Sequence, residues 1–272
     1  MNELPRLPCY LNGEFTALKD AKISVMDRGF ILGDGVYEVV PVYGGQPFRF
    51  DQHMARLGRS LAELRIANPL THAQWREVIT KLIADYARST GANLPNIDQL
   101  IYIQVTRGVA LREHMMLDGL TPTVFVMSNA MKPVPPALRR AGAACVTASD
   151  FRWEKAHIKS TSLLGAVFAR QISVDAGALE TVMFRHGFLS EAAASNVWVV
   201  KDGTVRGSPR DNLVLEGIRY GLIEELCRAG GIAFELRRIS REEVFDADEL
   251  LLSSATKEVL AVTRLDGQPV GA

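Results

Sequence analysis

The sequence has little cysteine and no excess charge of either sign. Its three cysteines, Cys9, Cys145 and Cys227, are odd in number and far apart, which argues against a disulfide framework and against metal-ligand spacing. Its 31 lysine and arginine residues equal its 31 aspartate and glutamate residues, so net charge gives no sign of a nucleic-acid partner. We therefore expect reduced thiols, no bound metal and no nucleic acid.

Long hydrophobic runs are absent as well. No uninterrupted apolar stretch is long enough to cross a bilayer, so no membrane partner is expected. The opening segment MNELPRLP contains an acidic residue and two prolines and lacks the apolar region of a signal peptide. The sequence also lacks a Walker loop, a GxSxG elbow and a GxGxxG motif before a helix. With these classes of protein excluded, we expect a cytoplasmic protein of the α/β class.

Hydrophobic periodicity then indicates where helices and strands alternate. Asn12-Gly13 and Asp202-Gly203 stand between apolar runs, a pattern typical of β-hairpin turns. Thr71 and Gln74 have the spacing of a capping box at the start of a helix. The expected helices are 52–66, 71–89, 161–176 and 217–229, and the expected strands include 36–43, 99–108, 122–129, 181–185, 232–238 and 249–253.

A proline-rich segment, AMKPVPPA, separates the two halves of the sequence. Prolines at this density disfavour both a helix interior and a central strand, which is typical of a linker. We therefore predict an α/β fold with a small N-terminal α+β domain at 1–129, a linker at 130–136 and a larger C-terminal α/β domain at 137–272.

Several short motifs carry the functional signal together. HIKSTSLLG contains Lys159 and SEAAASN contains Glu191, and DRGFILGDGVYEVV, HMARLGRS, LEGIRYGL and SSATKEVLAV complete the set. In this order they resemble the motifs of fold-type IV pyridoxal-phosphate enzymes, where DRGFILGDGVYEVV matches a glycine-rich strand. The resemblance extends over nearly the whole chain. It implies a class IV aminotransferase with pyridoxal 5′-phosphate as its cofactor.

The resemblance also implies roles for single residues. Lys159, in the C-terminal domain, would form the Schiff base with the cofactor and shuttle the proton of the substrate α-carbon. Glu191 would keep the pyridine nitrogen protonated, which makes the ring an electron sink. Leu215 would pack against the ring face. Ser195 and Asn196 complete the motif that begins at Glu191 and are expected beside the cofactor.

The phosphate of the cofactor needs positive charge and aimed donors. The resemblance assigns this role to Arg56, to Gly217 and Ile218 at the start of a helix, and to the segment Ser254, Ala255 and Thr256. Ala192 to Ala194, Arg219 and Ala255 depart from the family pattern because they replace glycine and hydroxyl residues. We therefore expect looser cofactor retention, partly offset by the charge of Arg219.

The segment QVTRGVALREHMML resembles the substrate loop of D-amino-acid transaminases, which contains an Arg-x-His pair. Arg112 and His114 are the matching residues, and Tyr37 is expected to add a hydroxyl. In those relatives the partner subunit contributes the loop, so the resemblance implies a homodimer. The expected substrates are small molecules: D-alanine or D-glutamate as donors, and the 2-oxo acids pyruvate or 2-oxoglutarate as acceptors.

Four other functions remain open at this point. A branched-chain L-amino-acid aminotransferase would use the same Lys159 and Glu191 but would not need the Arg-x-His pair. An (R)-amine transaminase and an aminodeoxychorismate lyase share the same fold. A binding module without catalysis would leave Lys159 as an ordinary surface residue.

Overall fold

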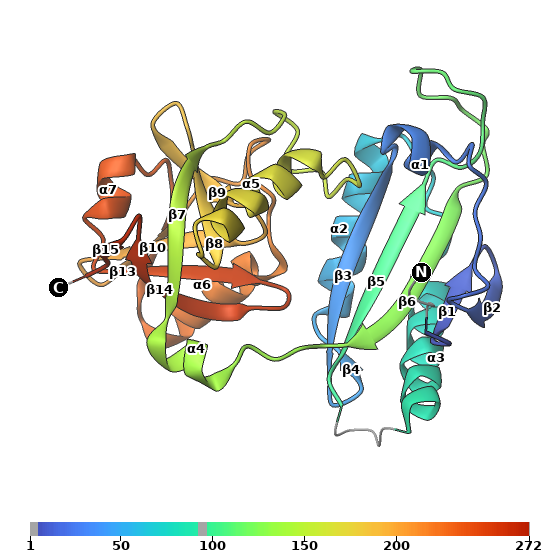
Figure 1. Ribbon diagram of the computed structural model, residues 1–272, viewed down its shortest axis with the longest axis horizontal. Coiled ribbons are helices and arrows are strands. Elements are labelled where there is room, and N and C mark those ends of the chain that lie inside the picture. Colours follow the sequence, from blue (N-terminus) through green and yellow to red (C-terminus); the bar gives the residue numbers. More distant parts are fainter. Residues whose placement is uncertain (1–4, 92–96, 272) are drawn as a thin grey trace. The chain divides into compact units, whose positions relative to one another are not determined.

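The chain folds into two compact units. A computed structural model describes residues 5–91 and 97–271 of the protein (Figure 1). The first unit comprises Met1–Lys132 together with Ile158–Ser162, and the second comprises Pro133–His157 and Leu163–Ala272. The first boundary between the units therefore falls inside the proline-rich segment. In the described part of the chain, no helix is both long and apolar enough to span a membrane.

Unit 1 is a six-stranded antiparallel sheet with two helices packed against it. The strand order is β2-β1-β6-β5-β3-β4, and α2 and α3 contact strands β1, β3, β5 and β6. The apolar core lies between these helices and the sheet. Its elements are β1 (Pro8–Leu11), β2 (Glu14–Ala17), α1 (Arg28–Leu32), β3 (Gly35–Tyr43), β4 (Gln46–Pro47), α2 (Phe50–Glu63), α3 (His72–Thr90), β5 (Gln99–Thr106) and β6 (Thr123–Ala130).

Local sequence signals account well for α3. Thr71 accepts a hydrogen bond from the backbone N–H of Gln74, and the Gln74 side chain accepts one from the backbone N–H of Thr71, so the predicted capping box is present. Trp75, Ile79 and Leu82 lie on one face of the helix and are almost fully buried. The left-handed backbone of Gly91 (φ 67°) ends the helix.

Unit 2 contains a nine-stranded mixed sheet. The strand order is β12-β11-β10-β13-β14-β7-β8-β9, with β15 paired to β14. The pairs β11·β12, β14·β7 and β7·β8 are parallel. Its elements are α4 (Pro136–Ala141), β7 (Ala143–Ser149), α5 (Leu164–Asp175), β8 (Glu180–Arg185), β9 (Phe188–Ala192), β10 (Asn196–Lys201), β11 (Thr204–Gly207), α6 (Ile218–Gly230), β12 (Ala233–Leu236), α7 (Arg241–Phe245), β13 (Glu249–Ser254), β14 (Glu258–Leu265) and β15 (Gln268–Pro269).

Two sequence predictions are corrected by this arrangement. Lys159 was expected in the C-terminal domain, but the segment Ile158–Ser162 belongs to unit 1. The reason is backbone pairing with β3: the Tyr37 N–H donates to the Lys159 carbonyl at 2.9 Å, and the Thr161 N–H donates to the Gly35 carbonyl at 2.9 Å. The helix expected from residue 161 consequently begins only at Leu164.

A smaller difference concerns the glycine-rich segment DRGFILGDG, which the resemblance matches to a strand. It forms a short helix, α1, capped by Asp27 and ended by Gly33, while the strand predicted at 36–43 is confirmed and begins at Gly35. The Asp27 carboxylate accepts a hydrogen bond from the Gly29 N–H at 2.8 Å, which favours the helical turn over an extended chain.

Candidate active site

Lys159 is held at the side of strand β3 in unit 1. Its N–H donates to the Ser60 hydroxyl at 3.3 Å, and its neighbour Ser160 forms a bridge with Val36. Its Nζ lies 4.0 Å from the centroid of the Tyr37 ring. The side chain is half-buried, so it is not an ordinary solvated surface lysine.

A buried ionic cluster lies on the same unit. The Arg56 guanidinium donates to both oxygens of Glu38, at 2.7 Å and 2.8 Å, and His53 Nδ1 lies 2.8 Å from Glu38. Burial would raise the pKa of Glu38, but Arg56 and His53 outweigh it and hold the pKa well below its usual range. Burial, together with the charges of Arg56 and Lys159, lowers the pKa of His53. Arg56 is thus held in a fixed place by Glu38 through its Nε and Nη2.

Unit 2 contributes a buried carboxylate, Glu191. Arg152 Nη1 donates to its Oε1 at 2.5 Å, Asn196 Nδ2 to its Oε2 at 3.1 Å and the Leu215 N–H to Oε1 at 3.3 Å. Burial raises the pKa of Glu191, and the adjacent Arg152 opposes this only in part. A second carboxylate, Asp150, accepts two further hydrogen bonds from the Arg152 guanidinium at 3.0 Å and 2.9 Å.

The predicted phosphate residues of unit 2 gather at the start of α6. Gly217 is the N-cap of this helix and provides no side-chain hydrogen bond to the first turn. A Cβ at Gly217 would come within 2.0 Å of Asn196 Oδ1, so only glycine leaves Asn196 in place. Arg219 is buried, and it donates to the carbonyls of Ser254 at 2.7 Å and Ala255 at 3.3 Å.

The guanidinium of Arg219 therefore connects the first turn of α6, through hydrogen bonds, to the segment that contains Ser254, Ala255 and Thr256. The structure thus brings Ser254 and Ala255 to the first turn of α6, where Ile218 is the first helical residue. The main chain of Leu215 contacts Glu191 and Asn196. The hydroxyl of Ser195 donates to Glu180 at 3.0 Å and lies 3.0 Å from Lys257 Nζ.

Several partners in these clusters were missed by sequence reasoning. Glu38 directly follows the expected substrate residue Tyr37. Its position in a β-prone stretch was the one sequence feature that could have pointed to its part in the cluster. Arg152 and Lys257 reach Glu191 and Glu180 across many residues of sequence, so no local pattern pointed to them.

Arg112 and His114 lie in the exposed loop between β5 and β6. Arg112 Nη2 is 3.4 Å from His114 Nε2, so both basic side chains stand together on the surface of unit 1. Tyr37 lies on β3 and stacks on Tyr102, with ring centroids 6.0 Å apart. An adjacent guanidinium and imidazole make a suitable receptor for a carboxylate.

Each unit contains donor groups that fit pyridoxal 5′-phosphate. Unit 1 provides the amine of Lys159 for an aldehyde, and its buried His53 Nε2 has no hydrogen-bond partner in the described structure. Unit 2 provides a buried carboxylate for a pyridinium nitrogen and an uncapped helix start for a phosphate. Among residues 5–91 and 97–271, no cluster of side chains could hold a metal ion.

Comparison with known proteins agrees with this chemistry. The model of the family "Amino-transferase class IV" matches residues 35–265. A D-alanine aminotransferase from Bacillus licheniformis is 35% identical over 260 residues, which cover 96% of this chain and 89% of that protein.

Two solved structures extend the comparison. A fold IV transaminase from Curtobacterium pusillum is 26% identical with a TM-score of 0.83, covering 95% of this chain and 88% of that one. A 4-amino-4-deoxychorismate lyase from Pseudomonas aeruginosa is also 26% identical with a TM-score of 0.80, covering 97% and 94%, so the fold alone does not choose the reaction. On the family model and the extent of these matches, the chain belongs to the class IV aminotransferases.

Proposed function

We propose that this chain is a D-amino-acid aminotransferase that uses pyridoxal 5′-phosphate to move the amino group of D-alanine or D-glutamate to pyruvate or 2-oxoglutarate. The adjacent Arg112 and His114 carry the proposal, because together they would form a carboxylate receptor and their sequence context resembles the substrate loop of D-specific enzymes. Relatives named D-alanine aminotransferase support it, with 35% identity to this chain in Bacillus licheniformis and 33% in Staphylococcus epidermidis.

Each residue of the candidate site would have a defined task. The bound cofactor supplies an electron sink for the charge that develops at the substrate α-carbon. Lys159 would hold the cofactor through Nζ and, when released, move the proton at the α-carbon. Glu191 would hold a proton at the pyridine nitrogen. Arg56 and the first turn of α6, which includes Arg219, would bind the phosphate.

Recognition of the carboxylate would determine the enantiomer. Lys159 would move the proton on one face only, so the side on which the carboxylate is bound would decide which enantiomer presents its α-hydrogen. The planar fork of Arg112 suits two parallel charge-assisted bonds, and His114 adds a third donor. Binding of the carboxylate at Arg112 and His114 corresponds to a D-amino acid.

The visible absorption spectrum of the purified protein, before and after amino acid is added, tests the proposal. The band of the lysine-bound cofactor should disappear with D-alanine and persist with L-leucine, and D-alanine with 2-oxoglutarate should yield pyruvate. Loss of the band with L-leucine alone would instead favour a branched-chain aminotransferase. A protein that stays colourless when the cofactor is added would contradict the cofactor assignment itself.

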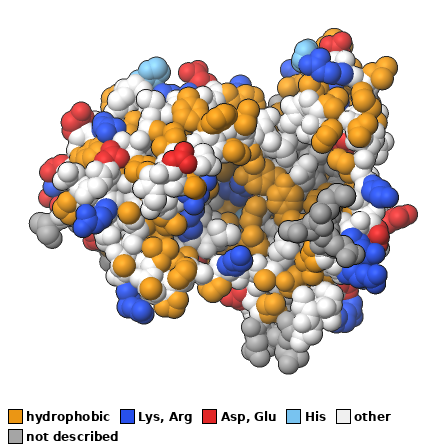
Figure 2. Space-filling model, in the orientation of Figure 1, with side chains coloured by type: hydrophobic (Ala, Val, Ile, Leu, Met, Phe, Trp, Pro, Cys, Tyr) orange, Lys and Arg blue, Asp and Glu red, His pale blue; other side chains and the backbone are white. Residues whose placement is uncertain are grey.

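We further propose a homodimer in which each loop serves the partner's site. The loop exposes Leu111 and Met115, and the adjoining α1 exposes Phe30. Figure 2 shows hydrophobic side chains beside basic and histidine side chains where Figure 1 draws this loop. Clustered exposed apolar side chains next to polar ones are typical of an interface.

Mixing two impaired variants, assayed at a D-alanine concentration far below the KM of Arg112→Ala, tests the shared site. Lys159→Ala and Arg112→Ala subunits, unfolded and refolded together, should regain about a quarter of the original activity, because half of the dimers are hybrids with one intact site of two. The two variants refolded separately are the control. If the mixture is no more active than the separate variants, each site takes its loop from its own chain.

A further inference from the structure

The loop that contains Arg112 and His114 has no regular secondary structure of its own. It connects the end of β5 at Thr106 to the start of β6 at Thr123 and extends beyond the sheet (Figure 1). Its tip is exposed to solvent, so burial of its own side chains cannot order it. A loop that must present two side chains in a fixed geometry needs support from another element.

Arg28 provides this support from α1. Its Nη1 donates to the Glu113 carbonyl at 2.6 Å, and its Nη2 donates to the Met115 carbonyl at 2.9 Å. These two carbonyls flank His114 directly. Because Arg28 itself is only 2% exposed, its guanidinium fixes the backbone on both sides of His114 from a rigid position.

Asp34 holds the guanidinium of Arg28 in turn. Arg28 Nε donates to Asp34 Oδ2 at 2.8 Å, and Arg107 donates to both Asp34 oxygens at 2.7 Å and 3.2 Å. Burial would raise the pKa of Asp34, but the two arginines lower it, so the carboxylate remains charged. Arg107 also lies 3.5 Å from the Leu117 carbonyl, further along the same loop.

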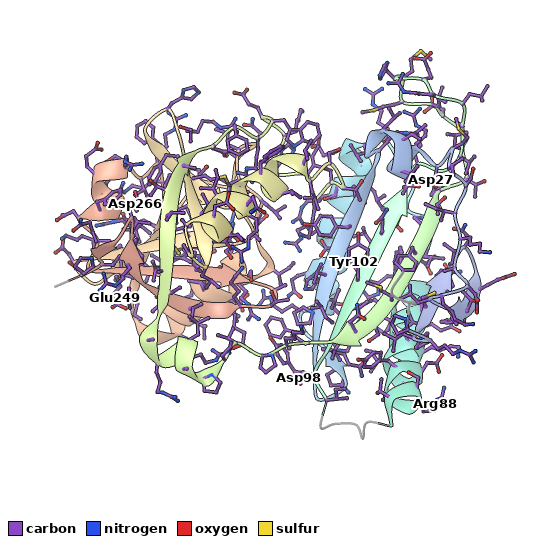
Figure 3. All side chains as sticks on the ribbon, in the orientation of Figure 1. Asp27, Arg88, Asp98, Tyr102, Glu249 and Asp266 are labelled. Atoms are coloured by element: carbon purple, nitrogen blue, oxygen red, sulfur yellow. The ribbon has the colours of Figure 1, made fainter. Side chains whose placement is uncertain are left out.

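The base of the loop is fixed next to the same segment. The Arg28 N–H donates to the Gly108 carbonyl at 2.9 Å, and the Ala110 N–H donates to the Met26 carbonyl at 3.3 Å. Asp27, labelled in Figure 3 at the end of the unit 1 sheet, accepts hydrogen bonds from Thr106 at 3.1 Å and Thr123 at 2.6 Å, the two residues between which the loop leaves the sheet. The base of the loop is therefore held by these hydrogen bonds, and Arg28 adds two more at its tip.

We propose that Arg28 is a positioning residue for substrate recognition: by binding the carbonyls of Glu113 and Met115, it sets the arrangement in which Arg112 and His114 receive the substrate carboxylate. The inference rests on the proposed function and adds a residue that does not contact substrate. It also gives a reason for a buried arginine on a five-residue helix, because the two loop carbonyls need a rigid pair of donors.

A double-mutant cycle with the holoenzyme tests this role. Arg28→Met removes the fork while Asp34 keeps Arg107 as its partner, so the unit should still fold. The KM for D-alanine should rise about 10- to 100-fold with little change in kcat, because misplaced recognition groups weaken binding. Arg112→Ala should have a similar effect, and the double variant should be no worse than Arg112→Ala alone, because both changes remove one interaction.

Two further variants and one measurement keep the test specific. Arg28→Lys retains the charge beside Asp34 but has no fork for two carbonyls, so it should reproduce most of the rise in KM. Arg88→Met, at an exposed arginine of α3, is the matched control and should leave KM unchanged. Hydrogen exchange of the amides from 110 to 118 should become faster in Arg28→Met and not in Arg88→Met.

Additive effects of Arg28 and Arg112, or unchanged exchange in the loop, would overturn the inference. A shift in kcat alone, or a fall in thermal stability without a change in KM, would assign Arg28 to the structure of unit 1 only. If the unaltered protein does not react with D-alanine at all, the proposed function fails first, and that result is obtained before any variant is made.

Discussion

Replacing Lys159 by alanine is expected to lower amino transfer about 10²- to 10⁴-fold, the range over which a positioned acid–base group contributes to catalysis. The visible absorbance of the lysine-bound cofactor should disappear as well, because alanine offers no amine. The fold should survive, since the residue contacts α2 and β3 through its backbone: its N–H bonds to Ser60 of α2 and its carbonyl accepts the Tyr37 N–H of β3. Initial rates with D-alanine and 2-oxoglutarate, together with the absorption spectrum, measure both effects.

Lys155→Ala is the matched control for this experiment. Lys155 is an exposed lysine only four positions earlier in the sequence, and its removal should change neither rate nor spectrum. Trapping with borohydride followed by peptide mapping should label Lys159 in the unaltered protein. An active, coloured Lys159→Ala variant would mean that another lysine holds the cofactor.

Elements with strong local signals could be predicted from the sequence. The helix α3 and the hairpins at Asn12-Gly13 and Asp202-Gly203 depend on caps, turn residues and periodicity within a few positions, and these predictions are confirmed. Strand β14 was missed although Leu260, Val262 and Leu265 are buried along it, because its segment was interpreted only as a cofactor motif. The pattern of apolar residues that indicates a strand can therefore be overlooked in a segment that has already been interpreted as a functional motif.

The features that could not be predicted depend on contacts between distant residues. The assignment of Lys159 to unit 1 follows from hydrogen bonds to Gly35 and Tyr37, more than a hundred residues away, while its sequence neighbours belong to unit 2. The ion pair of Arg152 with Glu191 likewise joins two segments that are separate in sequence. Motif resemblance pointed to single residues of the candidate site, whereas only the three-dimensional structure supplied the partners that set their charge.

The pairing of Arg152 with Glu191 leads to the second large effect. Glu191 must be ionised to hold a proton at the pyridine nitrogen, and burial already raises its pKa above the ordinary value while Arg152 limits the rise. Replacing Arg152 by glutamine removes the cation, so the pKa should rise by a further amount of about 1 to 3 pH units. As the pH falls, Glu191 is protonated earlier in the variant. Activity and cofactor binding should therefore be lost at a higher pH in the variant than in the unaltered protein, and the difference should equal the rise in the pKa of Glu191.

The conservative variant separates charge from packing. Arg152→Lys retains a cation near Glu191 and should leave the acidic limb of the pH profile close to that of the unaltered protein, whereas a purely structural role would make both variants equally unstable at every pH. The profile is measured twice, as kcat/KM for D-alanine and as cofactor bound to the apoprotein at equilibrium, because the second measurement does not depend on turnover. Asp150 also loses its partner when Arg152 is replaced, but Arg185, 3.4 Å away, remains beside it. An acidic limb that does not move in Arg152→Gln would show that Glu191 is not the group whose protonation ends activity, and the role of the ring-nitrogen partner would then have to pass to another residue.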